Sequence, residues 1–322
     1  MALFYVDSCC AAPCCHLHQV SPWHRTFPGG FQTFTGSGRA SCHVVCAWCA
    51  ICSVYYLFTM PHPNRFCLDA LGIDHLPALA TCLHPLPIRT SGDILLAAGI
   101  HLREARFEPA RFDPNLFILL NIARPDVLRG AAPARLAEFL AGRYCAGHAL
   151  LAAGRGWTSV PVGAQREPCW PVGVCGTISH TRRGGHGHAI AAVAHDIGDR
   201  LALGVDLEDL IDDAAQPALA EMILDAQEQE LRPTDEDPAR WLTLAFSAKE
   251  SLFKAVFPDV RSYLDFQVAR LVTAQAGWFC LRLMQDIHPR WRAGQLIWGR
   301  YQWSGIRLTT LLVHPDPDAP AG

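Results

Sequence analysis

Lysine is the residue type that this sequence nearly lacks. The chain has 27 basic residues, of which 25 are arginine and only two, Lys249 and Lys254, are lysine. The accompanying abundance of alanine, arginine and proline suggests a GC-rich coding sequence, which removes lysine wherever any cation serves. An ammonium can release its proton, whereas a guanidinium effectively cannot. The two lysines are therefore either leftover surface residues or groups whose chemistry arginine cannot supply.

Charge of either sign is also scarce, because only 18% of the residues are charged and the formal net charge is −3. Such a balance gives no electrostatic reason to expect nucleic acid as a partner. Half of the residues are apolar, and 9 tryptophans with 15 phenylalanines exclude wholesale disorder. Glycine and proline show no period, which excludes collagen-like sequence. With 322 residues, the chain can form one large domain or two ordinary ones.

Cysteine is concentrated at the start of the chain. Of the 14 cysteines, eight precede Met60 and only four follow Leu83. The few dispersed cysteines of the later part do not resemble a disulfide framework, which predicts a reduced, cytoplasmic protein.

Residues 1–59 differ in composition from all that follows. We expect them to be a non-native or disordered extension, such as a wrongly assigned start codon produces. The cysteines between positions 42 and 52 leave an iron–sulfur or zinc site open, since thiolates bind both. The apolar run 44–60 leaves a membrane anchor open, although a span needs about 20 residues. The composition favours the extension, so a membrane partner is not expected.

The body of the chain mixes helices with short strands. An apolar stripe predicts a helix over 133–153, and a turn-like connection predicts a hairpin of 188–195 with 201–208. Further helices are predicted at 214–231 and 238–257, and further strands at 266–273, 278–284, 295–303 and 307–313. Because the strand pairs look antiparallel, the fold class is α+β and not a wound parallel sheet.

Two acidic side chains share one face of the predicted strand 201–208. Asp206 and Glu208 are two residues apart, so they project together, with the small Gly204 beside them leaving room for an ion. Neighbouring carboxylates repel unless a cation bridges them, and hard oxygen ligands suit Mg²⁺ or Mn²⁺. An ordinary solvated strand face is the alternative for this pair.

Two more charged residues lie one turn apart on the predicted helix 238–257. Glu250 and Lys254 share a face of that helix, and a surface ion pair is the alternative explanation. Ser179 and His180 end a strand-like run that begins at Gly176, and both side chains can bond a phosphate; a polar turn is the alternative. Arg143 interrupts the apolar stripe of helix 133–153, so it needs an anionic partner or must extend to water.

The order of three motifs carries a resemblance to a known family. They are Gly-Thr-Ile-Ser-His at 176–180, Gly-Val-Asp-Leu-Glu at 204–208 and Phe-Ser-Ala-Lys-Glu-Ser-Leu-Phe-Lys at 246–254. Together they resemble the 4′-phosphopantetheinyl transferases, of the enterobactin synthetase component D and Sfp type. The resemblance implies a monomer built as a pseudo-twofold pair of similar α+β halves. We assign these to 60–187 and 188–322, the second half carrying the metal site.

The resemblance also implies the roles of individual residues. Asp206, Glu208 and Glu250 match the ligands of Mg²⁺, or of Mn²⁺, and Lys254 matches the lysine that assists the departing phosphate. Ser179 and His180 match the pair that contacts the coenzyme A phosphates. Arg166 matches a basic residue of a Gly-Lys/Arg-Pro element, which Glu167 interrupts here. Arg143 is a further candidate, for the 3′-phosphate.

The implied reaction moves 4′-phosphopantetheine from coenzyme A to a serine of an apo acyl or peptidyl carrier protein, releasing 3′,5′-ADP. Such reactions serve siderophore or secondary-metabolite biosynthesis. Glu250, directly or through a metal-bound water, is the candidate base for the serine proton. Two alternatives remain. One is a Mg²⁺-dependent nucleotide phosphohydrolase, which the absence of a Walker-type glycine loop disfavours. The other is a non-catalytic carrier-protein binder, which the intact carboxylates and lysine disfavour.

Overall fold

The computed structural model describes residues 82–87, 93–95, 97, 99–196, 201–316 and 318–320, all within one compact unit of the chain. The expected extension 1–59, with its cysteine-rich and apolar segments, lies outside these residues. Among the described helices, none combines the length and the apolar character that a membrane crossing requires.

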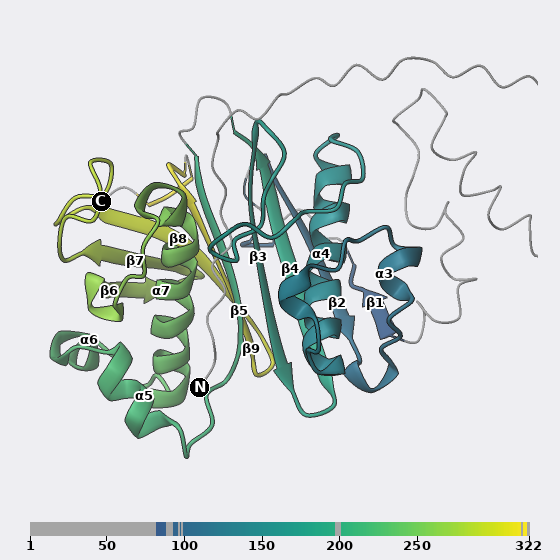
Figure 1. Ribbon diagram of the computed structural model, residues 1–322. Helices are drawn as coiled ribbons and strands as arrows, with labels where there is room; N and C mark the ends of the chain where they lie inside the picture. Colours follow the sequence, from purple (N-terminus) through teal and green to yellow (C-terminus); the bar gives the residue numbers. More distant parts are fainter. Residues whose placement is uncertain are drawn as a thin grey trace, which may run out of the picture. The chain divides into compact units, whose positions relative to one another are not determined.

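The first half of the described chain forms a four-stranded antiparallel sheet. Its strands, in spatial order, are β1 (Leu83–Pro85), β2 (Ile100–Phe107), β4 (His186–His195) and β3 (Val174–Arg183). The long helix α4 (Pro133–Ala152) packs on this sheet (Figure 1). Phe107, Leu140 and Leu150 are fully buried in the core between them. The connection from β2 to α4 contains three short helical turns, η3 (Pro109–Arg111), α3 (Leu116–Leu119) and η4 (Asp126–Leu128).

The second half repeats this plan with five antiparallel strands and one long helix. In spatial order the strands are β5 (Ala202–Asp209), β9 (Arg307–His314), β8 (Leu296–Ser304), β7 (Trp278–Leu283) and β6 (Ala269–Gln275). Helix α7 (Pro238–Val260) packs on this sheet over its own apolar core. Three short elements, α5 (Gln216–Ile223), α6 (Ala226–Glu230) and η5 (Phe266–Val268), complete this half.

The two sheets meet along their edge strands β3 and β5, which lie side by side at the centre of Figure 1. Behind this edge, a third apolar cluster joins β2 and β4 of the first sheet to β5 and β9 of the second. Ile190, Leu203 and Leu207 are fully buried in it. The two long helices therefore lie on the outer faces of a common core, in an α+β fold as expected.

Most elements confirm the sequence predictions. The helices expected at 133–153 and 238–257 are α4 and α7, and each of the four C-terminal strands is present within a few residues. Helix α7 begins where Asp237 accepts hydrogen bonds from Ala239 N–H (2.7 Å) and Arg240 N–H (3.2 Å), which satisfies two donors that a helix start leaves open. It ends at Arg261, whose φ of 53° is left-handed.

Three expectations need correction. The hairpin of 188–195 with 201–208 is wrong, because β4 pairs with β2 and β3 while β5 pairs with β9. Turn residues between two strands signal a change of direction, but long-range pairing decides which sheet each strand enters. For the same reason, the boundary expected at 187/188 cuts through β4, and the sheets divide between β4 and β5 instead.

The third correction concerns the helix expected at 214–231. It is interrupted between α5 and α6, where Asp225 starts a new helix. Asp225 and Glu228 form a capping box, in which each side chain accepts the other's backbone N–H at 2.9 Å. This local bond competes with continuation of the helix.

Two glycines make room for neighbouring groups, and the role of Gly204 differs from the one expected. A Cβ at Gly204 would lie 1.8 Å from the carbonyl oxygen of Ser251, so this glycine lets α7 approach β5 and does not make room for an ion. A Cβ at Gly176 would lie 2.6 Å from the ring of Trp170, so this position accommodates an indole.

We therefore expect Gly204→Ala to destabilise the protein by about 3 kcal/mol, the upper range for overpacking, because a rigid backbone carbonyl occupies the space. Urea unfolding followed by circular dichroism measures this change. Gly185→Ala is the control, since a Cβ there meets nothing within 4 Å, and it should stay within about 0.5 kcal/mol of the parent. Equal stability of the two variants would contradict the close approach of α7 to β5.

Candidate active site

One cavity of about 720 Å³ lies between the two halves of the described chain. Helices α4, α5 and α7, strands β3 and β5 and the loop 155–173 all contribute to its wall. The residues that the sequence singled out for chemistry all line it: Arg143, Arg166, Ser179, His180, Asp206, Glu208, Glu250 and Lys254. Their convergence is observed, while the role of each remains a prediction.

Asp206 is the centre of a buried hydrogen-bond network and is 3% exposed. Its Oδ1 accepts from Ser179 Oγ at 2.9 Å and from Lys254 Nζ at 2.7 Å, and its Oδ2 accepts from Ser247 Oγ at 2.8 Å. Lys254 Nζ also donates to Ser179 Oγ at 2.9 Å and to the carbonyl of Val205 at 3.1 Å. Lys254 is thus a buried counter-charge, and the surface ion pair with Glu250 is not what it forms.

Helix α7 is fastened to the second sheet by hydroxyl groups beside this network. Ser247 Oγ and Ser251 Oγ lie 2.9 Å and 2.6 Å from Thr310 Oγ1 on β9. Sequence reasoning missed both serines. Their signal was available, because two small hydroxyls one turn apart on the buried face of an apolar helix need polar partners.

Glu208 and Glu250 supply the other two carboxyl groups of the cluster, and the ionised form of each is destabilised. Burial, with the charge of Asp206 adding to it, raises the pKa of Glu250 to about 8. The same two causes raise the pKa of Glu208 well above its usual range. The ammonium of Lys254 opposes both shifts without cancelling them. The cluster therefore contains more carboxyl groups than the ammonium of Lys254 can neutralise.

Within the described residues, no three histidine, cysteine, aspartate or glutamate side chains are already arranged to hold a metal ion. The donor set nevertheless fits one. Three carboxyl groups line a single cavity, and hard oxygen donors are what Mg²⁺ binds. Burial and the charge of Asp206 raise the pKa values of Glu208 and Glu250, and a cation placed beside these groups would favour their ionised forms.

The basic side of the cavity centres on His180. Burial lowers the pKa of His180 to about 4; the charge of Glu138 opposes this shift and the charge of Arg135 adds to it, so the imidazole is neutral at physiological pH. Its Nε2 lies 3.1 Å from Nη1 of Arg135, which also pairs with Glu138 at 3.1 Å. Sequence reasoning missed Arg135. It lies on α4, two turns before Arg143, and this spacing on one helix was the available signal.

Arg143 is buried, with 4% of its surface exposed, so it does not extend to water. Its Nε donates to the carbonyl of Val160 at 2.8 Å, and its guanidinium lies 4.6 Å from the ring centre of Phe139. Both contacts hold the cation at the cavity wall. Arg166 reaches the same cavity from the loop 155–173, where its backbone has a φ of 72°.

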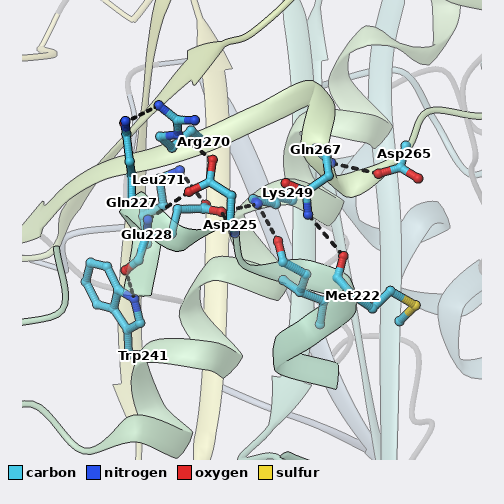
Figure 2. A network of polar contacts seen from close by, with 11 residues as sticks. Met222, Asp225, Gln227, Glu228, Trp241, Lys249, Asp265, Gln267, Arg270 and Leu271 are labelled. Atoms are coloured by element: carbon cyan, nitrogen blue, oxygen red, sulfur yellow. Dashed lines mark hydrogen bonds and ion pairs between the residues drawn. The ribbon is translucent and has the colours of Figure 1, made fainter. Parts of the chain in front are cut away.

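Lys249 belongs to a different network of polar contacts, which Figure 2 shows from close by. It is 4% exposed, and its Nζ donates to Ile223 O at 2.6 Å and to Glu228 Oε2 at 2.8 Å. The fully buried Glu228 also accepts the N–H of Leu271 at 2.7 Å. Lys249 therefore ties α7 to the end of α5 and to α6, and the surface-lysine alternative is wrong for it.

Lys249→Met should lower the free energy of unfolding by about 3–5 kcal/mol, because it leaves the buried Glu228 without its counter-charge. Lys249→Arg should lower it by about 1–3 kcal/mol, since a larger guanidinium overpacks the site. Chemical unfolding measures both. Arg129→Gln, which breaks an exposed ion pair with Asp126, is the control and should change little. A fully stable Lys249→Arg would show that arginine fits equally well.

Two protein-family models match this chain. The model described as the 4′-phosphopantetheinyl transferase N-terminal domain matches residues 124–194, and that of the 4′-phosphopantetheinyl transferase superfamily matches residues 202–306. These two segments contain every site residue named above.

Individual relatives agree with the family models. The chain is 35% identical to enterobactin synthase component D of Salmonella typhi over 58% of this chain and 75% of that protein. It is 34% identical to the 4′-phosphopantetheinyl transferase Svp of Streptomyces mobaraensis, over 60% and 76% of the two chains. It is 30% identical to the 4′-phosphopantetheinyl transferase PptT of Mycobacterium tuberculosis, over 54% and 76%.

Proposed function

This chain belongs to the 4′-phosphopantetheinyl transferase superfamily and is an enzyme of that class, and we propose that it modifies a serine of an apo peptidyl or acyl carrier protein. The similarity to enterobactin synthase component D supports a carrier protein of siderophore biosynthesis. The observation that carries the proposal is the single cavity that joins the three carboxyl groups and Lys254 to four further basic side chains. Those four are Arg135, Arg143, Arg166 and His180.

Coenzyme A fits this distribution of charge. Its pyrophosphate and 3′-phosphate are anionic, and arginine donors and imidazole N–H groups bind such oxygens. Because His180 Nε2 faces a donor of Arg135, the neutral imidazole carries its proton on Nδ1 and can donate it to a phosphate oxygen. The described residues that line the cavity come from both halves of this chain, and we propose that the chain acts as a monomer.

Asp206, Glu208 and Glu250 would hold a Mg²⁺ or Mn²⁺ ion. When bound, such an ion neutralises pyrophosphate charge and so favours attack on phosphorus. The excess of buried carboxylate supports this assignment.

Two residues of α7 carry the proton and charge transfers. The carrier serine hydroxyl attacks the phosphorus that bears pantetheine, and Glu250 in its ionised, carboxylate form accepts the hydroxyl proton. The bond to the departing 3′,5′-ADP breaks, and the ammonium of Lys254 stabilises the negative charge that forms on its phosphate. Lys254 is fixed for this task by its bonds to Asp206 and Ser179. The described Cys82, Cys145, Cys175 and Cys280 are free thiols, which supports the cytoplasm, where thiols stay reduced, as the location of the reaction.

The deciding experiment incubates the protein with coenzyme A, Mg²⁺ and apo peptidyl and acyl carrier proteins. We expect a carrier mass gain of one phosphopantetheine arm, equimolar release of 3′,5′-ADP, and loss of both in excess EDTA. Glu250→Gln should lower kcat by about 10²–10⁴-fold, as loss of a general base does. The exposed Glu230→Gln is its control. Hydrolysis of nucleotides without carrier modification would identify the alternative phosphohydrolase.

Arg135 provides a second test, on the binding of coenzyme A. Arg135→Gln should weaken coenzyme A binding by about tenfold or more, the worth of a hydrogen bond to a charged group, with a smaller loss of kcat. Calorimetric titration gives the dissociation constant directly. Arg182→Gln is a matched control, because Arg182 bonds the same Glu138 at 2.9 Å but does not line the cavity. Equal effects of both changes would assign Arg135 to holding Glu138 only.

A further inference from the structure

The loop 155–173 contains a carboxylate that faces inward although most of the loop is on the surface. Glu167 is 6% exposed. Its side chain folds back over Gly163, where an added Cβ would lie 2.4 Å from the carboxyl carbon. Oε2 accepts the backbone N–H of Gln165 at 2.8 Å. Glu167, which interrupts the expected Gly-Lys/Arg-Pro element, therefore has its side chain buried inside the loop.

The backbone of this loop closes tightly around that carboxylate. The N–H of Gly163 donates to the carbonyl of Glu167 at 2.6 Å, and the N–H of Arg166 donates to the carbonyl of Gly163 at 3.0 Å. The closure leaves Arg166 with a φ of 72°. A non-glycine residue in that region is held there by its surroundings at an energetic cost.

The same loop is fastened to Arg261, the residue that directly follows α7. Oε1 of Glu167 lies 3.5 Å from Nη1 of Arg261, and Nε2 of Gln165 donates to the carbonyl of Arg261 at 3.1 Å. Arg261 is itself fixed, because its Nε donates to the carbonyl of Pro258 at 3.1 Å. Two contacts therefore connect the loop that carries Arg166 to the helix that carries Glu250 and Lys254.

We propose that Glu167 is a positioning residue, whose carboxylate, held between the Gln165 N–H and the Arg261 guanidinium, sets the loop so that Arg166 meets the phosphates of coenzyme A. The proposal rests on the proposed function, in which Arg166 binds those phosphates. Glu167 itself does not line the cavity. It acts by holding the loop in place, and its ion pair with Arg261 connects the loop to the end of α7.

This role predicts an effect on binding that depends on Arg166. Glu167→Ala removes the carboxylate that contacts both the N–H of Gln165 and the guanidinium of Arg261. It should raise the coenzyme A dissociation constant about tenfold. Glu167→Gln breaks only the ion pair, whereas Arg261→Gln breaks the ion pair together with the bond from Arg261 Nε to the Pro258 carbonyl. Each should raise the dissociation constant about three- to fivefold. In each variant kcat at saturating coenzyme A should fall less than KM rises, since the loss concerns a ground-state contact.

The decisive measurement is a double-mutant cycle by calorimetry of coenzyme A binding to the full chain. Glu167→Gln added to Arg166→Ala should cause little further loss, because the group being positioned is already gone. Arg290→Gln is the control, since it breaks an ion pair with Asp259 at the same end of α7 (3.0 Å) without touching the loop. Chemical unfolding verifies that each variant is folded.

Two results would overturn the proposal and differ in meaning. If Arg166→Ala weakens binding but Glu167→Gln and Arg261→Gln do not, or if the effects add fully, Glu167 only stabilises the loop. If Arg166→Ala itself binds coenzyme A normally, the phosphate role assigned under the proposed function fails, and the positioning role fails with it. If Glu167→Ala fails to fold, Arg261→Gln still tests the proposal, because the side chain of Arg261 is partly exposed, at 29%.

Discussion

The site depends on how the edges of the two sheets meet. Side-chain hydroxyls of β3 join the edges, in place of a ladder of backbone hydrogen bonds between β3 and β5. Thr177 Oγ1 accepts the N–H of Val205, and Ser179 Oγ accepts the N–H of Leu207, each at 3.2 Å. An edge strand normally leaves such donors open to other chains. Here the hydroxyls of β3 satisfy them, and Asp206, between the two bonded residues, turns its carboxylate toward α7 and Ser179. The junction of the halves and the acidic cluster are therefore one structure.

That junction also explains the charge of the cavity. An ammonium and a buried carboxylate with well-placed hydrogen bonds stabilise each other, and Lys254 satisfies Asp206 in this way. Glu208 and Glu250 lie in the same region, where burial and the charge of Asp206 raise their pKa values more than the ammonium of Lys254 lowers them. Polar groups arranged against local stability are typical of functional sites. The fold supplies this strained cluster from β5 and α7, and the groups that we propose to bind phosphate come in part from α4 and β3.

Local patterns in the sequence predicted the helices and the residue types of the site, whereas long-range contacts remained out of reach. The apolar stripe of α4 and the Asp237 cap of α7 are local features, because residues close in sequence make each of them. The partner of β5 is β9, about a hundred residues away, so a turn signal beside β5 misled. Gly204 was predicted to leave room for an ion, because Ser251, whose carbonyl group it accommodates, is distant in sequence. Arg135 was missed for the same reason, since only the fold brings it to His180.

The scarcity of lysine finds its explanation in the geometry of two buried carboxylates. Lys249 and Lys254 are five residues apart on α7, which turns their side chains toward different sides of one helix. The ammonium of Lys254 meets three acceptors, namely Asp206, Ser179 and Val205, around one nitrogen. The ammonium of Lys249 meets a helix-end carbonyl and Glu228 in the same manner. A planar guanidinium presents its donors in a wide fork and cannot converge on such compact sets of oxygens. Codon bias can therefore remove lysine from the surface of this protein while these two positions resist the exchange, one for the chemistry of the cavity and one for the attachment of its wall.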